Sequence, residues 1–109
     1  MDVITVRAPP PPKMTSMVIG LLEIQLHLPE SHSLKDKRQP LRSILARVRQ
    51  NHNVSIAEVA HHDEWQRASL AVVGVNTERV PMERTLDQIL REVEETPGVV
   101  CAGEQRQWL

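Results

Sequence analysis

The stretch GLLEIQLHL, residues 20–28, sets apolar and polar residues at alternating positions. Because successive side chains of a strand point to opposite faces, this period of two predicts a strand that buries one face. Pro29 ends the strand, since proline cannot donate to a sheet ladder. The apolar face consists of Leu22, Ile24, Leu26 and Leu28, and the other face carries Glu23, Gln25 and His27.

Two segments repeat apolar residues with the helical period. In residues 34–50 the apolar positions recur at three, four and seven residues, which predicts a helix with one buried face. Residues 78–96 show the same pattern, and Pro97-Gly98 follows it as a stop signal. The apolar positions are Leu34, Leu41, Ile44, Leu45 and Val48 in the first segment, and Met82, Leu86, Ile89, Leu90 and Val93 in the second.

The start of the first helix is open to two interpretations. Ser33 suits the N-cap position, and Asp36 favours the positive end of the helix dipole. Pro40, however, cannot donate a hydrogen bond to the carbonyl of Asp36. The helix therefore either kinks at Pro40 or begins near Gln39 with proline in its first turn. We favour a short irregular turn over residues 34–38 that runs into a distorted helix.

Three further β-rich runs complete the pattern. Residues 54–60 and 68–75 flank a polar stretch, which predicts a hairpin, and residues 99–109 form a final strand. The order is strand, helix, strand, strand, helix, strand. This order predicts an α+β, ferredoxin-like βαββαβ fold, in which two helices pack on one face of a four-stranded antiparallel sheet.

Length and composition predict one small domain. The chain has 109 residues, of which 40% are hydrophobic and 25% charged. Residues 1–16 contain a run of four prolines and are predicted to form a disordered tail, which leaves residues 17–109 as the domain. We expect a cytoplasmic protein, since there is no secretory pattern and no apolar run of about 18 residues or more. The single Cys101 allows neither an internal disulfide nor a thiolate zinc site.

Three strings resemble the YlxP-like family of small bacterial proteins, a domain of unknown function. They are GLLEIQLHLPESHSLKDKR (20–38), NVSIAEV (53–59) and HDEWQRASLAVV (62–73). The resemblance covers essentially all of residues 17–109 and implies a ferredoxin-like fold. Genes of this family often lie beside those for a translation initiation factor and ribosome-binding factor A, which implies a role near the ribosome. The resemblance implies no catalytic residues.

Positive charge gathers on the first predicted helix. Residues 34–50 carry six cations against Asp36, whereas residues 78–96 carry six carboxylates against three arginines. The protein is thus electrically asymmetric although its net charge is only −1. At 100° per residue, four of the cations fall within an arc of roughly 60° beside the apolar face. We call these four residues the basic stripe: Lys35, Arg38, Arg42 and Arg49.

The basic stripe has a functional and a structural interpretation. Cations spaced along one helix edge are suited to contact RNA phosphates, in free RNA or in a ribosomal subunit. Alternatively, the stripe is a solvated face whose long side chains cover the edge of the core. Base stacking of the RRM type is not expected, because the chain has no Phe or Tyr. The competing hypothesis is a protein-interaction or self-assembly module, such as a homodimer, that covers the free sheet face.

Trp65 and Arg67, in the predicted hairpin loop, are secondary binding candidates. A loop tryptophan beside an arginine can anchor a ligand. The more frequent outcome, and the one we expect, is that Trp65 folds back to close the edge of the core while Arg67 pairs with a carboxylate.

Metal binding and catalysis find little support in the sequence. His61, His62, Asp63 and Glu64 are adjacent, so their side chains diverge, and they lack the spacing that sets two imidazoles on one helix face. No nucleophile–base–orienter set and no glycine-rich phosphate loop is present. We therefore expect a protein that is not an enzyme, with no cofactor, no metal and no small-molecule substrate.

Overall fold

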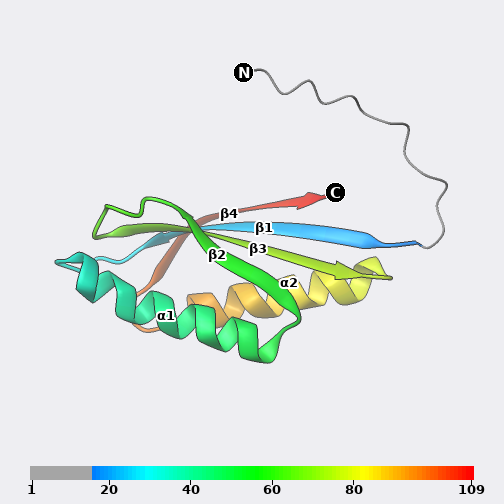
Figure 1. Ribbon diagram of the computed structural model, residues 1–109, viewed down its shortest axis with the longest axis horizontal. Coiled ribbons are helices and arrows are strands. Elements are labelled where there is room, and N and C mark those ends of the chain that lie inside the picture. The colour runs from blue at the N-terminus through cyan, green and yellow to red at the C-terminus, as the bar shows by residue number, and fades with distance from the viewer. Residues whose placement is uncertain (1–15) are drawn as a thin grey trace, which may run out of the picture.

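The computed structural model describes residues 16–109, which form four strands and two helices in the predicted order (Figure 1). Most of the predicted tail, residues 1–15, lies outside the described residues. The elements are β1 (Val18–His27), α1 (Leu34–Asn51), β2 (Val54–Ala60), β3 (Arg67–Asn76), α2 (Arg79–Glu94) and β4 (Val100–Trp108).

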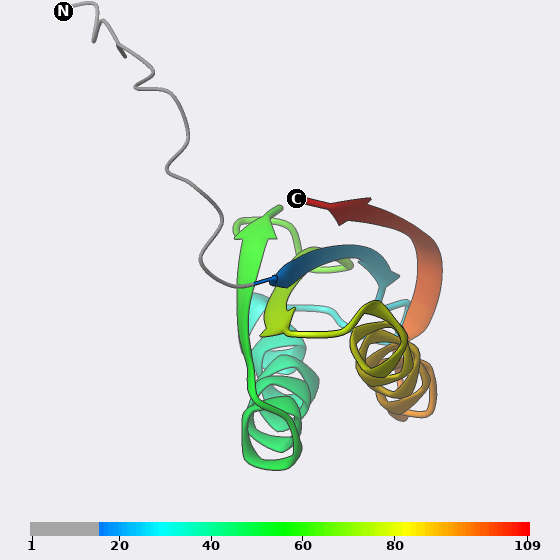
Figure 2. The same ribbon diagram turned by 90° about the vertical axis from the view of Figure 1, so that its right-hand side faces the viewer.

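The four strands form one antiparallel sheet in the order β2-β3-β1-β4. Both helices lie side by side on the same face of it, with α1 under β2 and α2 nearer β4 (Figure 2). This arrangement is the ferredoxin-like α+β fold, so the fold prediction is confirmed. The two edges of the sheet are β2 and β4, and β1 and β3 fill its centre.

The core lies between the sheet and the helices. The apolar face of β1 is almost completely buried, as its period of two predicted. Helix α2 buries the predicted Met82, Leu86, Ile89 and Val93. In α1 the buried face differs from the prediction, because Leu45 is only half-buried and a lysine takes a core position. The buried residues of α1 are Lys37, Leu41, Ile44 and Val48.

Helix α2 approaches the sheet closely at a glycine. Gly20 and Gly74 face each other across β1 and β3. A Cβ atom at Gly74 would lie 2.6 Å from the terminal methyl of Met82, which is closer than van der Waals contact allows. A side chain at Gly74 would displace the flexible end of Met82, and one at Gly20 would crowd Leu86 and Trp108 at 3.1 Å, where α2 packs on the central strands.

Helix α1 begins at Leu34 and continues through Pro40, so the predicted irregular turn over residues 34–38 is wrong. The cap explains why. The Asp36 amide donates to Ser33 Oγ at 3.0 Å, and Asp36 Oδ2 in return accepts from the His32 amide at 3.1 Å. These reciprocal bonds fix the first turn. Proline removes one bond to the carbonyl of Asp36, a residue exposed to solvent, and this loss does not end the helix.

The sheet face opposite the helices is apolar at one end and polar at the other. Val73 and Val75 of β3 are 39% and 58% exposed at the apolar end. Toward the other end, Ser69 Oγ donates to Gln25 Oε1 across β3 and β1. His27 is also exposed on this face.

Candidate nucleic-acid interface

Three residues of the basic stripe form one exposed patch on α1. Lys35, Arg38 and Arg42 are separated by three and four residues, so they follow one another along one face of the helix. All three are exposed, and together with Gln39 they line a shallow hollow. Within residues 16–109 no ion pair or hydrogen bond engages their side chains. We call Lys35, Arg38 and Arg42 the basic patch.

Arg49, the fourth member of the stripe, has a partner in the fold. Its guanidinium donates to the carbonyl oxygen of Ile56 in β2 at 3.0 Å. The stripe therefore runs along the flank of α1 that faces β2. On the other flank, Arg47 donates to Thr96 Oγ1 at 2.6 Å, just after α2. Of the four cations predicted to contact phosphates, all are exposed, but Arg49 alone has a hydrogen-bond partner among the described residues.

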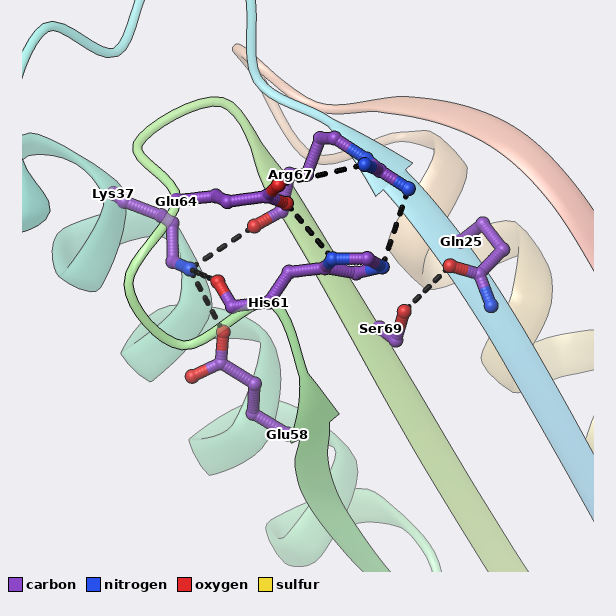
Figure 3. Close-up of polar contacts among 7 residues, drawn as sticks. All are labelled: Gln25, Lys37, Glu58, His61, Glu64, Arg67 and Ser69. Atoms are coloured by element: carbon purple, nitrogen blue, oxygen red, sulfur yellow. Dashed lines mark hydrogen bonds and ion pairs between the residues drawn. The ribbon is translucent and has the colours of Figure 1, made fainter.

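Lys37 lies on the core side of α1 and is only 2% exposed. Its ammonium donates to the carbonyl oxygens of His61, at 2.8 Å, and Arg67, at 3.0 Å, and pairs with Glu58 Oε2 at 3.0 Å (Figure 3). Two of the three N–H donors of the ammonium thus have carbonyl partners, and the Glu58 carboxylate lies within ion-pair distance although Oε2 accepts no hydrogen bond among the described residues. A buried charge is stable only when it is paired and hydrogen-bonded. Lys37 is therefore a structural residue that ties α1 to the β2–β3 hairpin.

The hairpin loop, residues 61–66, is also braced by its own side chains (Figure 3). His61 has a φ of 65°, in the left-handed region that residues other than glycine seldom adopt. Its Nδ1 lies 2.8 Å from Glu64 Oε2. Arg67 contacts both neighbours, at 3.5 Å from Glu64 Oε1 and 3.3 Å from His61 Nε2. The predicted pairing of Arg67 with a carboxylate is confirmed, and its partner is Glu64.

Trp65 stands at the outside of this braced loop with 55% of its surface exposed. The expectation that it folds back onto the core is wrong. The next residue turns inward instead, because the Gln66 side chain donates to the carbonyl oxygens of Pro29, at 3.3 Å, and Ser31, at 3.2 Å. These contacts hold the loop while they leave the indole free. Trp65 thus has the exposure that a binding anchor requires.

Sequence reasoning assigned no role to Lys37, although a signal was present. Lys37 precedes Leu41, Ile44 and Val48 by four, seven and eleven residues, so it lies on the buried face of the helix. A lysine in that register is either a flaw in the apolar face or a buried charge with partners. Its partners lie 21 to 30 residues further along the chain, and the spacing alone does not reveal them.

Other chemical groupings in the described part of the chain are few. No group of three or more His, Cys, Asp or Glu residues there is arranged to hold a metal ion. His62 lies apart from the His61 ring and contacts the Glu58 carbonyl oxygen at 3.2 Å. Across residues 16–109, no helix combines the length and the apolar composition needed to cross a bilayer.

The fold and this surface define a ferredoxin-like domain with a basic flank on its first helix. The family model described as "Protein of unknown function (DUF503)" matches residues 19–106, and the chain belongs to this family. The chain is also 34% identical, over 91 residues, to "Uncharacterized protein YlxP" from Bacillus subtilis (strain 168). That match covers 84% of this chain and 99% of the relative. The predicted YlxP-like membership is confirmed.

A solved structure supports the fold independently. The de novo designed protein Foldit4 superposes with a TM-score of 0.52 at 16% sequence identity. The superposition covers 86% of this chain and 97% of the designed protein. At this identity the likeness concerns the path of the backbone alone.

Proposed function

We propose that this protein binds RNA, free or within a ribosomal subunit, and catalyses no reaction. The basic patch contacts the phosphates. One observation carries the proposal: the other three cations of α1 are used within the fold, whereas Lys35, Arg38 and Arg42 extend from one face without an intramolecular partner among the described residues. Free cations at helical spacing can each displace counterions from a nucleic-acid backbone.

The mode of binding follows from what the surface offers. The open sheet face lacks the aromatic pair on which RRM domains stack bases, since the chain has no Phe or Tyr. Recognition therefore rests on phosphate and shape, with weak sequence preference. Trp65 and Arg67 are secondary contacts. The tryptophan offers one stacking surface from the loop that Lys37 attaches to α1.

The test is binding of the full chain to ribosomal RNA and to ribosomal subunits across a salt series. Three contacts to single-stranded RNA predict a slope of log affinity against log salt of about −2. The Arg38→Glu/Arg42→Glu variant should lose binding and keep its fold. The matched control is Arg84→Glu/Arg91→Glu, which changes the net charge equally but on α2, where both arginines are exposed.

Two results would contradict the proposal. If the unmodified protein binds neither RNA nor subunits at low salt, the patch is a solvated helix face. If both double variants lose binding equally, the effect follows net charge and no local site exists.

Trp65→Ala measures the secondary contact. Loss of one stacked base should weaken binding by about 1–3 kcal/mol without altering the salt slope.

A further inference from the structure

The two edge strands of the sheet differ in whether side chains contact their outward backbone groups. At the β2 edge, the Arg49 guanidinium of α1 donates a hydrogen bond to the carbonyl oxygen of Ile56 at 3.0 Å. His62 lies 3.2 Å from the next outward carbonyl, that of Glu58. Side chains that occupy edge carbonyls prevent another strand from pairing there. The β2 edge is thus capped.

The β4 edge has no such cap among the described residues. The Leu109 amide donates to the carbonyl oxygen of Ile19, so Leu109 directs its backbone groups toward β1. Backbone direction alternates along an antiparallel strand. Glu104, Arg106 and Trp108 therefore direct their N–H and C=O groups outward. Within residues 16–109 no element pairs with that side. The segment VCAGEQRQW contains neither proline nor lysine, and the register shift in its pairing with β1 lies between Gln25 and Leu26, before the regular stretch that holds the charged Glu104 and Arg106.

The charged side chains on this edge are complementary to those of the same strand in a second copy of the protein. When two copies of β4 pair antiparallel about a two-fold axis at Gln105, Glu104 of each copy lies directly opposite Arg106 of the other. Each of these pairs exchanges both N–H···O bonds, because both residues direct their backbones outward. Opposite charges at directly paired positions stabilise antiparallel strands. Within one chain, Arg106 contacts Asp87 at 2.6 Å, from the helix side, and Glu104 at 3.8 Å, so the dimer exchanges the longer contact for one with Glu104 of the second copy.

We propose that the protein forms a homodimer through its β4 edges, which joins the two sheets into one continuous eight-stranded sheet. The occupant is a second copy because the edge carries one anion and one cation in the order that a two-fold axis matches. Another strand would have to present the same alternation. The dimer leaves the basic patch free, since that patch lies on α1 beside β2, at the other edge of the sheet (Figure 2).

The experiment measures the mass of the full chain by sedimentation over a concentration series. We expect a dimer. Glu104→Arg places arginine opposite arginine at both symmetry-related sites, so it should weaken dimerisation about tenfold or more. Arg106→Glu should act likewise. In an Asp87→Asn background, which removes the carboxylate beside residue 106, the charge-exchanged variant Glu104→Arg/Arg106→Glu restores both pairs and should return the affinity to within about threefold of that of Asp87→Asn alone.

Amide exchange supplies the second measurement. In the dimer the outward amides of Glu104 and Arg106 should exchange slowly, and their protection should rise with protein concentration. Gln105, whose amide points to β1, should be protected at every concentration. Arg38→Glu/Arg42→Glu should leave dimerisation unchanged, so failure of RNA binding and failure of dimerisation are separable.

Three outcomes would overturn the inference. A monomer at every concentration would do so directly. Slow exchange at Arg106 in a monomer would show that another part of the chain covers the edge. A dimer that Val73→Glu disrupts and Glu104→Arg does not would assign the interface to the apolar end of the open sheet face.

Discussion

Helix α1 carries two groups of cations that differ in what they do. Lys37, Arg47 and Arg49 each contact a group elsewhere in the fold: the hairpin loop, the end of α2 and the edge of β2. The basic patch, on the same helix, has no such contact among the described residues. Charge count alone therefore describes neither stability nor binding. The position of each cation around the helix axis decides which of the two it supports.

The first way to break this comparison is Lys37→Met, for which we expect the largest effect. The substitution keeps the apolar stem but leaves Glu58 and the carbonyls of His61 and Arg67 without their donor. Removing one partner of a buried pair is strongly destabilising. Because the Glu58 side chain remains 21% exposed, we expect a loss near the lower end, about 3 kcal/mol of unfolding free energy. Urea unfolding followed by circular dichroism measures it.

A second variant identifies the source of that loss. Lys37→Met/Glu58→Gln also removes the unpaired carboxylate and should recover about 1 kcal/mol. The Arg67 carbonyl still lacks the lysine donor, whereas the His61 carbonyl keeps its bond from the Glu64 amide at 3.1 Å, so recovery should be incomplete. If Lys37→Met unfolds at the same urea concentration as the unmodified protein, the buried ammonium contributes nothing to stability and the distinction between the two groups fails.

The sequence predicted the fold well because the deciding signals are local. Alternation in residues 20–28 and helical spacing in residues 78–96 each reflect burial of one face, and both patterns are contained in a few consecutive residues. The error at residues 34–38 has a local cause as well. Pro40 predicts a distorted start, whereas the cap made by Ser33 and Asp36 fixes the first turn before the chain reaches proline.

The candidate site was only partly predictable, because its composition depends on contacts between distant segments. Spacing placed Lys35, Arg38 and Arg42 together. It could not reveal that Arg49 meets the edge of β2, since that contact follows from how α1 lies beneath the sheet. The exposure of Trp65 depends in the same way on Gln66, whose partners come from the connection between β1 and α1.

The second prediction concerns the link between the helices. Arg47→Ala removes the donor to Thr96 Oγ1 and leaves a buried hydroxyl with one fewer partner. Thr96 still donates to the carbonyl oxygen of Glu92, at 2.9 Å, so the hydroxyl is not orphaned. We expect a loss of about 1 kcal/mol in unfolding free energy. Thr96→Val in the Arg47→Ala background should then cost less than Thr96→Val alone. Equal costs in both backgrounds would show that the two side chains are not coupled.

Arg49→Gln tests the residue that sequence assigned to one group and structure to the other. Its bond to the Ile56 carbonyl is partly exposed, so we expect a stability loss of about 0.5 kcal/mol, the lower limit for a hydrogen bond. If the guanidinium is retained by β2 during RNA binding, the salt slope should stay unchanged. A slope reduced by about 0.7 would return Arg49 to the phosphate-binding set.

Arg42→Gln should change stability least, because no partner among residues 16–109 loses a contact, and surface substitutions of this kind usually have no measurable effect. Its effect on RNA should be distinct: removal of one phosphate contact lowers the salt slope by about 0.7. Arg84→Gln on α2 is the matched control, since it neutralises an equally exposed arginine outside the patch. If both variants lower the slope equally, the field of the whole molecule attracts RNA. If only Arg42→Gln does so, the free cations of α1 form a local site, and the contrast with Lys37 separates binding from stability within one helix.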